Sequence, residues 1–332
     1  MTYERIIGDL KKKIYFPVYF LSGEEPFFID AISGYIEKHV LSDSEKEFNL
    51  NIIYGIDIDI TTIISYARRF PLMANYQILI VKEAQNIKNI EELNVYIKNP
   101  VETTILVICY KYKKIDARRS FAKLIKENSV FFESKKLYDN KIPNWISSYL
   151  KQKDYSITPK ASMLLTEYLG NDLSKISNEL DKLLINQPAK TEINDAIVEE
   201  NTGISKDYNI FELQKALGKK DVFKANRICN YFAANEKENP MVRTIALLYM
   251  FFSKVMIYHR ISNKSRNNVA SVLSINPFFV NDYQVAAKNY NHLKLSQIIA
   301  GLQEYDLKAK GFGNVSTSHG ELLKELIYKI LH

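Results

Sequence analysis

The sequence predicts an α/β domain built on a parallel sheet, followed by two helical regions. Strand-like and helix-like segments alternate between residues 16 and 134, and residues 77–81 form a continuous apolar run without alternation. Such a run is typical of a strand buried on both faces, as in a parallel sheet covered by helices. From about residue 140 onward the periodicity is helical, with almost no strand signal. We therefore expect a sheet domain first and helical domains after it.

The alternating region is expected to pair its strands in parallel through right-handed crossovers, with helices on both faces of the sheet. We place residues 77–81 at the centre of the sheet because this run is apolar throughout. The expected strands are residues 16–21, 48–54, 77–81, 103–110 and 130–133, and the helices between them are residues 26–41, 59–69, 89–98 and 116–127.

The helical half divides into two groups of helices joined by a linker at residues 201–207. Thr158-Pro159 is a typical helix start and Gly170 a typical helix end. We expect domains at residues 1–138, 139–206 and 207–332. The expected helices are residues 143–151, 160–168, 173–185, 191–199, 210–217, 222–234, 240–261, 277–289, 293–309 and 319–331.

One of these helices has an unusually apolar centre at residues 245–257. This stretch of about 13 residues is shorter than a membrane span. A helix that is apolar nearly all round is expected in the core of a large bundle or in an oligomer interface.

Bulk composition predicts a multidomain cytosolic protein. The 332 residues exceed one ordinary domain, and 46% of them are hydrophobic. We expect no membrane span and no signal peptide. Cys109 and Cys229 are far apart in apolar surroundings, so reduced core thiols are expected and a zinc site is not. The net charge of +7 is compatible with an anionic partner, but 38 acidic residues weaken this signal.

The segment before the apolar strand combines a proline with large apolar and basic side chains. Pro71 prevents the preceding helix from continuing, so its neighbours lie at a helix end or in a connection. Connections run over the surface, where apolar groups gain nothing unless something covers them. These groups either fold back onto the core of their own domain or insert into a pocket of a partner. The apolar side chains concerned are Phe70, Leu72 and Met73, and the basic residues Arg68 and Arg69 precede them.

An α/β domain followed by helices suggests a nucleotide-binding protein, so the turn after the first strand is informative. A phosphate loop has the pattern G-x-x-x-x-G-K-[ST], in which backbone N–H groups and the lysine bind phosphates. The turn here has one glycine, no lysine and a proline at position 26. Its two carboxylates are expected to occupy the positive helix N-terminus themselves, so this loop should not bind ATP. The degenerate loop consists of Ser22, Gly23, Glu24 and Glu25.

The second nucleotide-handling position is also altered. A Walker-B strand ends in an aspartate that binds magnesium, whereas Lys82 and Glu83 stand here, and the lysine repels a cation. The five histidines are scattered without ligand spacing. Asp57 and Asp59 are expected as turn and helix-cap residues rather than an acid/base pair. We therefore expect no catalytic residue and no metal site.

Several stretches, taken in order, resemble one family. These are YFLSGEEPFFID, RRFPLMANYQILIVKEA, TTILVICYKYKKIDARRSFAKLIKEN and WISSYLKQKDYSITPKASMLLTEYLGNDLSKISNELDKL. The sequence resembles the delta subunit of the bacterial DNA polymerase III clamp loader, a member of the AAA+ group without ATPase motifs. The resemblance spans residues 14–330 and is strongest over residues 14–185. It implies an AAA+-like (RecA-like) domain, an all-α lid domain and an all-α collar domain.

The resemblance also implies a role in DNA replication. A delta subunit binds the ring-shaped sliding clamp (the beta subunit) and opens one interface, so that the loader places the ring on primed DNA. Leu72 and Met73 would insert into the clamp's hydrophobic pocket beside Phe70, with Arg68 and Arg69 against clamp-surface acids. Methionine stands where an aromatic residue is often found, but its flexible side chain suits an apolar pocket.

Further implications concern partners. Residues 207–332 would join the other loader subunits, of gamma/tau and delta-prime type, and the complex would contact primer-template DNA. The complex is a DNA-directed DNA polymerase, but this chain would need no cofactor, no membrane and no chemistry of its own. A cytoplasmic location in the replisome follows.

Two alternatives remain open from the residues alone. One is an AAA+ ATPase with a divergent nucleotide site, and the other is a stand-alone DNA-binding protein. Short basic clusters are compatible with solvated faces or with template-primer phosphates. They lie at residues 111–114, at Arg118-Arg119 and at Lys135-Lys136.

Overall fold

The computed structural model describes residues 1–116, 120–203, 205, 207–314 and 316–332. Arg118-Arg119 and part of the expected linker lie outside the described residues. The chain divides into two compact units, an N-terminal unit (residues 1–138 with 171–175) and a C-terminal unit (residues 139–170 with 176–332). The division into three domains at residues 138/139 and 206/207 stays a prediction.

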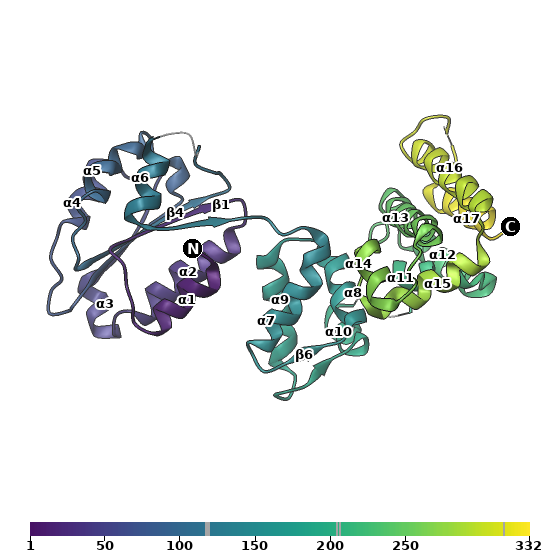
Figure 1. Ribbon diagram of the computed structural model, residues 1–332, viewed down its shortest axis with the longest axis horizontal. Coiled ribbons are helices and arrows are strands. Elements are labelled where there is room, and N and C mark those ends of the chain that lie inside the picture. The colour runs from purple at the N-terminus through teal and green to yellow at the C-terminus, as the bar shows by residue number, and fades with distance from the viewer. Residues whose placement is uncertain (117–119, 204, 206, 315) are drawn as a thin grey trace. The chain divides into compact units, whose positions relative to one another are not determined.

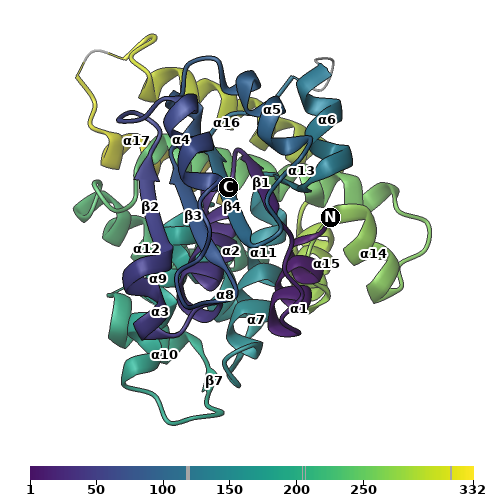
Figure 2. The same cartoon turned by 90° about the vertical axis from the view of Figure 1, so that its left-hand side faces the viewer.

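The N-terminal unit is built on a five-stranded sheet in the order β2-β3-β4-β1-β5, and every pair of neighbours is parallel. Figure 2 shows β2 and β3 side by side. In the register, Ile80 of β3 pairs with Val107 of β4, and Phe20 of β1 pairs with Ile108 of β4. The strands are β1 (Val18–Gly23), β2 (Leu50–Tyr54), β3 (Gln77–Lys82), β4 (Thr104–Lys111) and β5 (Val130–Ser134).

The placement of residues 77–81 at the centre of the sheet is wrong. β3 is next to the edge strand β2, and β4 is the central strand. An uninterrupted apolar run shows that a strand is buried on both faces, but every interior strand shares this property. Strand order depends on the crossovers, which the run does not encode.

Helices cover both faces of this sheet, as expected (Figure 1). Along β1, Phe20 packs into one hydrophobic core and its neighbour Tyr19 into the other, because successive side chains of a strand point to opposite faces. The first core includes α4, α5 and α6, and the second includes α1 and α2. These helices are α1 (Tyr3–Lys11), α2 (Pro26–His39), α4 (Ile60–Ala67), α5 (Asn94–Ile97) and α6 (Ser120–Asn128).

The N-terminal unit departs from the expected elements in three places. The helix α1 was not expected, and α3 (Asp43–Asn49) replaces the start of the strand expected at 48–54. A capping box begins α3, because Ser42 and Glu45 satisfy each other's backbone N–H groups. The helix expected at 89–98 is instead one short 3-10 helix, η2 (Ile90–Leu93), followed by α5; another 3-10 helix, η1 (Ala84–Asn86), lies before it.

The C-terminal unit is helical, so the expected fold class is confirmed: an α/β domain on a parallel sheet, followed by a helical region. A small parallel pair, β6 (Ser156–Ile157) with β7 (Glu192–Ile193), and the helix α14 were not expected. The remaining elements are η3 (Asp139–Lys141), α7 (Ile142–Lys151), α8 (Pro159–Leu169), α9 (Leu173–Ile185), α10 (Asp195–Thr202), α11 (Ile210–Lys219), α12 (Val222–Ala234), α13 (Met241–Arg260), α14 (Arg266–Leu273), η4 (Pro277–Phe279), α15 (Val280–Asn289), α16 (His292–Ala309) and α17 (His319–Leu331).

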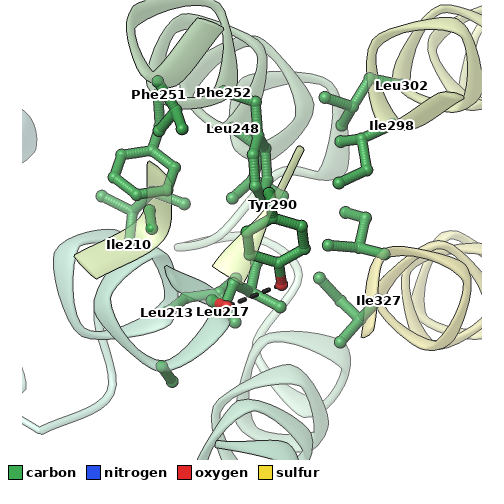
Figure 3. Close-up of a cluster of buried hydrophobic side chains, with 14 of the residues drawn as sticks. Ile210, Leu213, Leu217, Leu248, Phe251, Phe252, Tyr290, Ile298, Leu302 and Ile327 are labelled. Atoms are coloured by element: carbon green, nitrogen blue, oxygen red, sulfur yellow. Dashed lines mark hydrogen bonds between the residues drawn. The ribbon is translucent and has the colours of Figure 1, made fainter. Parts of the chain in front are cut away.

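The helices α11 to α17 share one hydrophobic core. Tyr290 lies at its centre, where its ring meets Phe252 edge-on at 5.5 Å and its hydroxyl donates to the Leu217 carbonyl over 2.7 Å (Figure 3). Cys229 packs in this core and Cys109 in the N-terminal unit, and both are buried free thiols, as predicted. Burial raises the pKa of Cys109 to about 12 and that of Cys229 to about 11.

Among the described residues, α13 is the one helix long and apolar enough to cross a membrane by length and composition. It has 20 residues and extends beyond the apolar centre at residues 245–257. Core helices of soluble proteins pass the same test, and α13 buries Ile245, Leu248, Phe252 and Val255 in the shared core. This packing is that of a bundle core helix.

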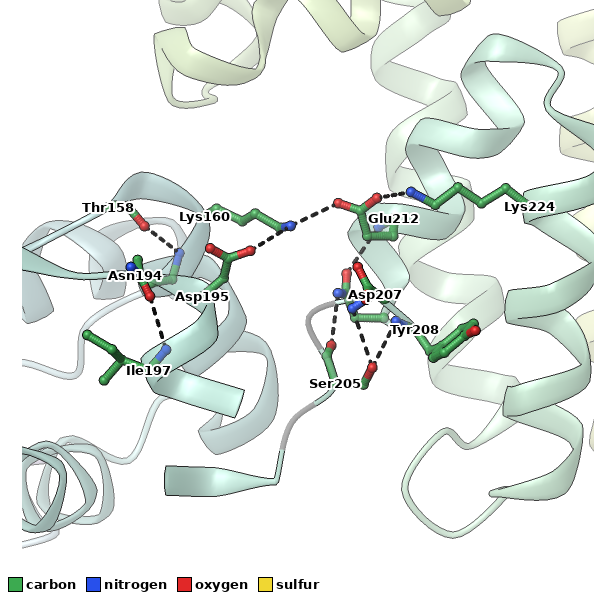
Figure 4. A network of polar contacts seen from close by, with 12 residues as sticks. Thr158, Lys160, Asn194, Asp195, Ile197, Ser205, Asp207, Tyr208, Glu212 and Lys224 are labelled. Carbon is green, nitrogen blue, oxygen red and sulfur yellow. Dashed lines mark hydrogen bonds and ion pairs between the residues drawn. The ribbon is translucent and has the colours of Figure 1, made fainter. Parts of the chain in front are cut away.

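A polar network links α8 and α10 to the first helices of the shared core (Figure 4). Lys160 contacts Asp195 at 2.9 Å and Glu212 at 3.1 Å, and Lys224 also pairs with Glu212. Burial acts to raise the pKa of Glu212, but the hydrogen bonds from Lys224 and Lys160 outweigh it, so the pKa lies below its usual value. Glu212 is therefore ionised between two cations.

The two rings at the centre of the C-terminal core are expected to differ in their contribution to stability. Phe252→Ala should lower the free energy of unfolding by about 3–5 kcal/mol, because it leaves a cavity. Tyr290→Phe should cost only about 1 kcal/mol, because the Leu217 carbonyl still accepts from the Lys220 N–H at 2.9 Å. Urea unfolding followed by circular dichroism measures both, and equal losses would contradict this account of the core.

Candidate functional site

The connection from α4 to β3 carries the exposed apolar group that the sequence singled out. Its exposed fractions are 81% for Phe70, 56% for Leu72 and 97% for Met73. These side chains therefore do not fold back onto the core of their own unit. Arg68 and Arg69 are exposed immediately before them. We call residues 68–76 the exposed loop.

The start of the exposed loop is fixed by a buried amide. Gln77, at the first position of β3, is 5% exposed. Its Nε2 group lies within hydrogen-bonding distance of the Thr104 hydroxyl (2.8 Å) and of the carbonyls of Tyr66 (3.3 Å), Ala67 (3.4 Å) and Arg69. The last carbonyls of an α-helix lack the N–H partners of the helix interior, and side chains are one way to satisfy them. Gln77 thereby ties the end of α4 to the sheet.

The same helix end is bound by two further buried hydroxyls. The Ala67 carbonyl accepts from the Thr104 hydroxyl at 2.9 Å and from the Tyr96 hydroxyl at 3.2 Å. Thr104 begins β4 and Tyr96 lies on α5, and both side chains are fully buried. The point where the chain leaves α4 is therefore held from three elements.

The middle of the exposed loop is held by Asn49 of α3. The Asn49 Oδ1 atom accepts from the Leu72 N–H at 2.7 Å, and its Nδ2 group donates to the Leu72 carbonyl at 3.0 Å. Nδ2 also donates to the Glu45 carbonyl at 3.0 Å, and Asn49 is 2% exposed. A buried amide thus clamps the backbone of Leu72 at both of its polar groups, which leaves the side chain outside.

The residues on either side of Leu72 in the exposed loop also have defined conformations or contacts. Met73 has φ of 53°, in the left-handed region that non-glycine residues seldom adopt. The Arg69 guanidinium stacks on the Tyr66 ring at 3.9 Å. Arg68 lines an open pocket of about 500 Å³ between α4 and α5, together with Ile64, Glu92 and Val95.

In the degenerate loop after β1, acceptors within the same unit bind the backbone N–H groups. The N–H groups of Glu24 and Glu25 both donate to the Ser134 carbonyl of β5, at 2.9 and 3.5 Å. Pro26 has no N–H group. The Phe27 N–H donates to the Glu25 carboxylate at 3.1 Å. At four consecutive residues, the donors that a phosphate loop would offer are therefore bound internally or missing.

Close packing enforces this arrangement. Gly23 has φ of 137°, and a Cβ atom there would lie 1.9 Å from the Ser134 oxygen. The Ser134 hydroxyl donates to the Glu25 carbonyl at 2.6 Å, while Ser22 is buried in β1. Burial raises the pKa of Glu25, although the hydrogen bond from the Phe27 N–H partly offsets the effect.

Lysines near this turn are paired with acids. Glu24 contacts Lys114 at 3.2 Å, and Lys111 contacts Asp30 at 2.6 Å. Lys82, at the end of β3, lies 3.7 Å from Glu37, and Glu83 is exposed with φ of 53°. Within the described part of the chain, no cluster of three acidic, histidine or cysteine side chains is arranged to hold a metal ion.

Sequence reasoning identified the displayed side chains but missed the residues that hold them. Asn49 and Gln77 are polar residues next to apolar strands, and nothing in their local sequence indicates a contact with a loop 23 or 8 positions away. The one available signal is Gln77, a polar residue at the first position of a buried strand. Because buried polar groups need hydrogen-bond partners, such a residue indicates a contact with a neighbouring segment.

These features define a class: an α/β domain on a parallel sheet, with an internally bonded turn after its first strand, followed along the chain by a helical region. The chain matches two family models, described as "DNA polymerase III, delta subunit" over residues 19–135 and "DNA polymerase III delta subunit, C-terminal domain" over residues 207–323. It is 26% identical over 314 residues to DNA polymerase III subunit delta of Bacillus subtilis, covering 91% of this chain and 90% of that protein.

A solved structure has the same fold. The Bacillus subtilis DNA clamp loader delta protein (YqeN) aligns with a TM-score of 0.53 and 22% identity, covering 99% of both chains. The chain belongs to the DNA polymerase III delta subunit family. Its role is therefore in DNA replication, as a subunit of the polymerase complex.

Asn49→Ala should release the exposed loop. The Leu72 amide is expected to exchange with solvent about tenfold faster, and the free energy of unfolding to fall by about 1–2 kcal/mol, because two hydrogen bonds to Leu72 and one to Glu45 are lost. Hydrogen exchange read by mass spectrometry measures the first effect. Phe48→Ala, at the exposed neighbouring position, is the matched control and should change neither quantity. Unchanged exchange at Leu72 in the Asn49 variant would contradict the clamping role.

Proposed function

We propose that this chain binds the sliding clamp through the exposed loop and opens one interface of the ring, so that the loader can place it on primed DNA. The observation that carries the proposal is the exposure of Leu72 and Met73 on a backbone held by Asn49 and Gln77. Exposed apolar side chains on an ordered loop lose little conformational entropy when a pocket covers them. Family membership supports this partner.

The expected contact has a small number of anchors. Leu72 and Met73 would each contribute on the order of 1.5–3 kcal/mol if a clamp pocket buried them fully. Phe70 would cover the rim of that pocket, and Arg68 and Arg69 would face acidic groups on the clamp. Energetic anchors surrounded by weaker contacts are the usual organisation of protein interfaces.

Opening needs no chemistry in this chain. If the exposed loop binds the open or strained clamp edge more tightly than the closed one, binding shifts the clamp toward the open state by that difference in affinity. Neighbouring loader subunits that hydrolyse ATP would control whether the exposed loop is accessible. The proposed role of this chain is therefore that of a binding subunit.

We also propose that this chain hydrolyses no ATP itself. Support comes from the degenerate loop, where Gly23 and Ser134 are packed too closely for another ligand to take the backbone donors. Lys82 at the Walker-B position adds a positive charge where a magnesium ligand would be required. Both positions therefore support the proposal that this chain does not hydrolyse ATP.

The other proposed partners follow from the family. Residues 207–332 would form the collar that joins this chain to gamma/tau and delta-prime type subunits, and the assembled loader would contact primer-template DNA. We place the complex in the cytoplasm, at the replisome. The division into AAA+-like, lid and collar domains at residues 138/139 and 206/207 is part of the same proposal.

The double variant Leu72→Ala/Met73→Ala tests the site. Its affinity for the sliding clamp of the same organism should fall at least tenfold, which corresponds to about 1.4 kcal/mol, because both anchors are removed. Surface plasmon resonance with immobilised clamp measures the dissociation constant.

The matched control is Ile56→Ala/Leu293→Ala, which truncates two exposed aliphatic side chains outside the exposed loop. It should bind the clamp as the wild type does. Wild-type binding that survives in the Leu72/Met73 variant would move the site elsewhere, and wild-type protein that does not bind at all would overturn the proposed function.

A further inference from the structure

One edge of the five-stranded sheet in the N-terminal unit is open. The edge strand β2 pairs with β3 on one side (Figure 2), and no strand among the described residues pairs with its other side. Its side chains are half-buried or exposed, whereas those of β1 are buried throughout. The sequence of β2, LNIIY, contains no charged residue and no proline. Proteins usually protect an edge strand with such residues, with a bulge or with a covering segment.

The opposite edge strand, β5, is different. It carries the exposed charge of Glu133, and its Phe131 carbonyl accepts from the N-terminal amine at 3.1 Å. Its Ser134 carbonyl accepts from the turn after β1. A further strand on this side would meet a charge and groups that are already bonded, so β2 is the edge that is open to pairing.

The hydrogen bonds around β2 show which of its backbone groups point away from β3. Along a strand, successive residues turn their N–H and C=O groups to opposite sides, so every second residue faces the same neighbour. The Gly55 N–H donates to the Lys82 carbonyl of β3 at 2.8 Å. Residues 51 and 53 therefore also face β3, and residues 50, 52 and 54 face away from it.

Two of the groups that face away are already bonded. The Leu50 N–H donates to the Lys46 carbonyl, and the Tyr54 carbonyl accepts from the Asp57 N–H at 3.0 Å. Within the described part of the chain, the other groups form no hydrogen bond: the Leu50 carbonyl, both groups of Ile52 and the Tyr54 N–H. We call these groups the edge slot. It is centred on Ile52 and can accept a further strand through its own hydrogen bonds.

Both ends of the edge slot are acidic. Glu47 and Asp57 lie at equal separations in sequence before and after Ile52, and both are exposed. Among the described residues, neither carboxylate forms an ion pair, whereas the neighbouring Lys46 is bound to Asp43 at 2.7 Å. The edge slot therefore carries an uncompensated negative charge at each end, which favours a partner with cations at the matching positions.

The same acids argue against a second copy of this chain as the occupant. In antiparallel self-pairing about Ile52, Glu47 of each copy would lie opposite Asp57 of the other. Like charges directly opposite each other destabilise a strand pair, and this pair would contain two such contacts. Exposed apolar side chains, Phe48 and Ile56, lie just inside the two acids. The ends of the edge slot thus combine an apolar and an acidic group.

We propose that the edge slot binds an extended segment of another protein, with alternating apolar residues in its middle and lysine or arginine at both ends. The segment adds a strand to the open edge of the sheet. Main-chain hydrogen bonds to residues 50, 52 and 54 provide affinity, and the side chains at the two ends provide specificity. The proposal does not rest on clamp binding, because no group of the exposed loop belongs to the edge slot.

The test uses the full-length chain and a fluorescein-labelled peptide of about 11 residues, which matches the span of residues 47–57. The peptide has lysine at both ends, with valine and threonine alternating between them. Fluorescence anisotropy should show saturable binding. The same peptide with proline in place of threonine should not bind, because proline has no N–H group to donate.

Amide exchange followed by NMR locates the bound peptide. Exchange of the Ile52 N–H should slow about tenfold or more when the peptide is bound, because this group gains an acceptor. The Ile53 N–H faces β3 and should change much less. Binding without slower exchange at Ile52 would place the peptide elsewhere and overturn the proposal.

A charge exchange tests the acidic ends. Glu47→Lys/Asp57→Lys should weaken binding of the lysine peptide about tenfold, and a peptide with glutamate at both ends should bind this variant better than it binds the wild type. The matched control Glu200→Lys/Glu238→Lys makes the same change at two exposed carboxylates of the C-terminal unit and should bind as the wild type does. Thermal unfolding by circular dichroism checks that each variant is folded.

Three results would overturn the proposal. The first is a wild-type chain that does not bind the lysine peptide, or that binds the proline peptide equally well. The second is a Glu47/Asp57 variant that keeps the wild-type affinity. The third is a wild-type dimer in analytical ultracentrifugation that the lysine peptide dissociates, because this would identify a second copy of the chain as the occupant of the edge slot.

Discussion

Two buried carboxamides, those of Gln77 and Asn49, determine how this protein presents its exposed loop. Gln77 binds the last carbonyls of α4 from the first position of β3, and Asn49 binds both backbone groups of Leu72. Removing either partner would leave buried polar groups without a hydrogen bond, so these contacts are hard to exchange for others. The loop is consequently a fixed platform, and the apolar side chains of Leu72 and Met73 are its solvent-facing surface.

In the turn after β1, internal hydrogen bonds likewise fix the backbone, but here they use up donors instead of displaying side chains. In a phosphate loop, backbone donors stay open for a ligand, whereas here the Ser134 carbonyl and the Glu25 carboxylate take them. Gly23 permits the approach because it has no Cβ atom. At the turn where a phosphate loop would stand, the backbone donors of this protein thus make contacts within the N-terminal unit.

The sequence predicted those parts of the fold in which one residue pattern decides the outcome. Buried strands such as β3 and β4 and long periodic helices such as α12 and α17 were found, and so were the apolar residues of the exposed loop. The order of the strands was missed, because an apolar run reports burial and not neighbours. The helix α3 was missed because it abuts a strand, and the pair β6–β7 because two-residue strands carry no periodicity. Asn49 was missed because its partner is distant in sequence.

The central claim is that the side chain of Met73 is in contact with the sliding clamp when the two proteins associate. The most direct measurement is photocrosslinking with a benzophenone side chain in place of Met73, in the presence of clamp, with the same group at Ile56 as the comparison. The account predicts a crosslink to the clamp from position 73, which mass spectrometry should place in one apolar pocket, and none from position 56. Equal crosslinking from both positions, or none from position 73 in a mixture that binds, would contradict it.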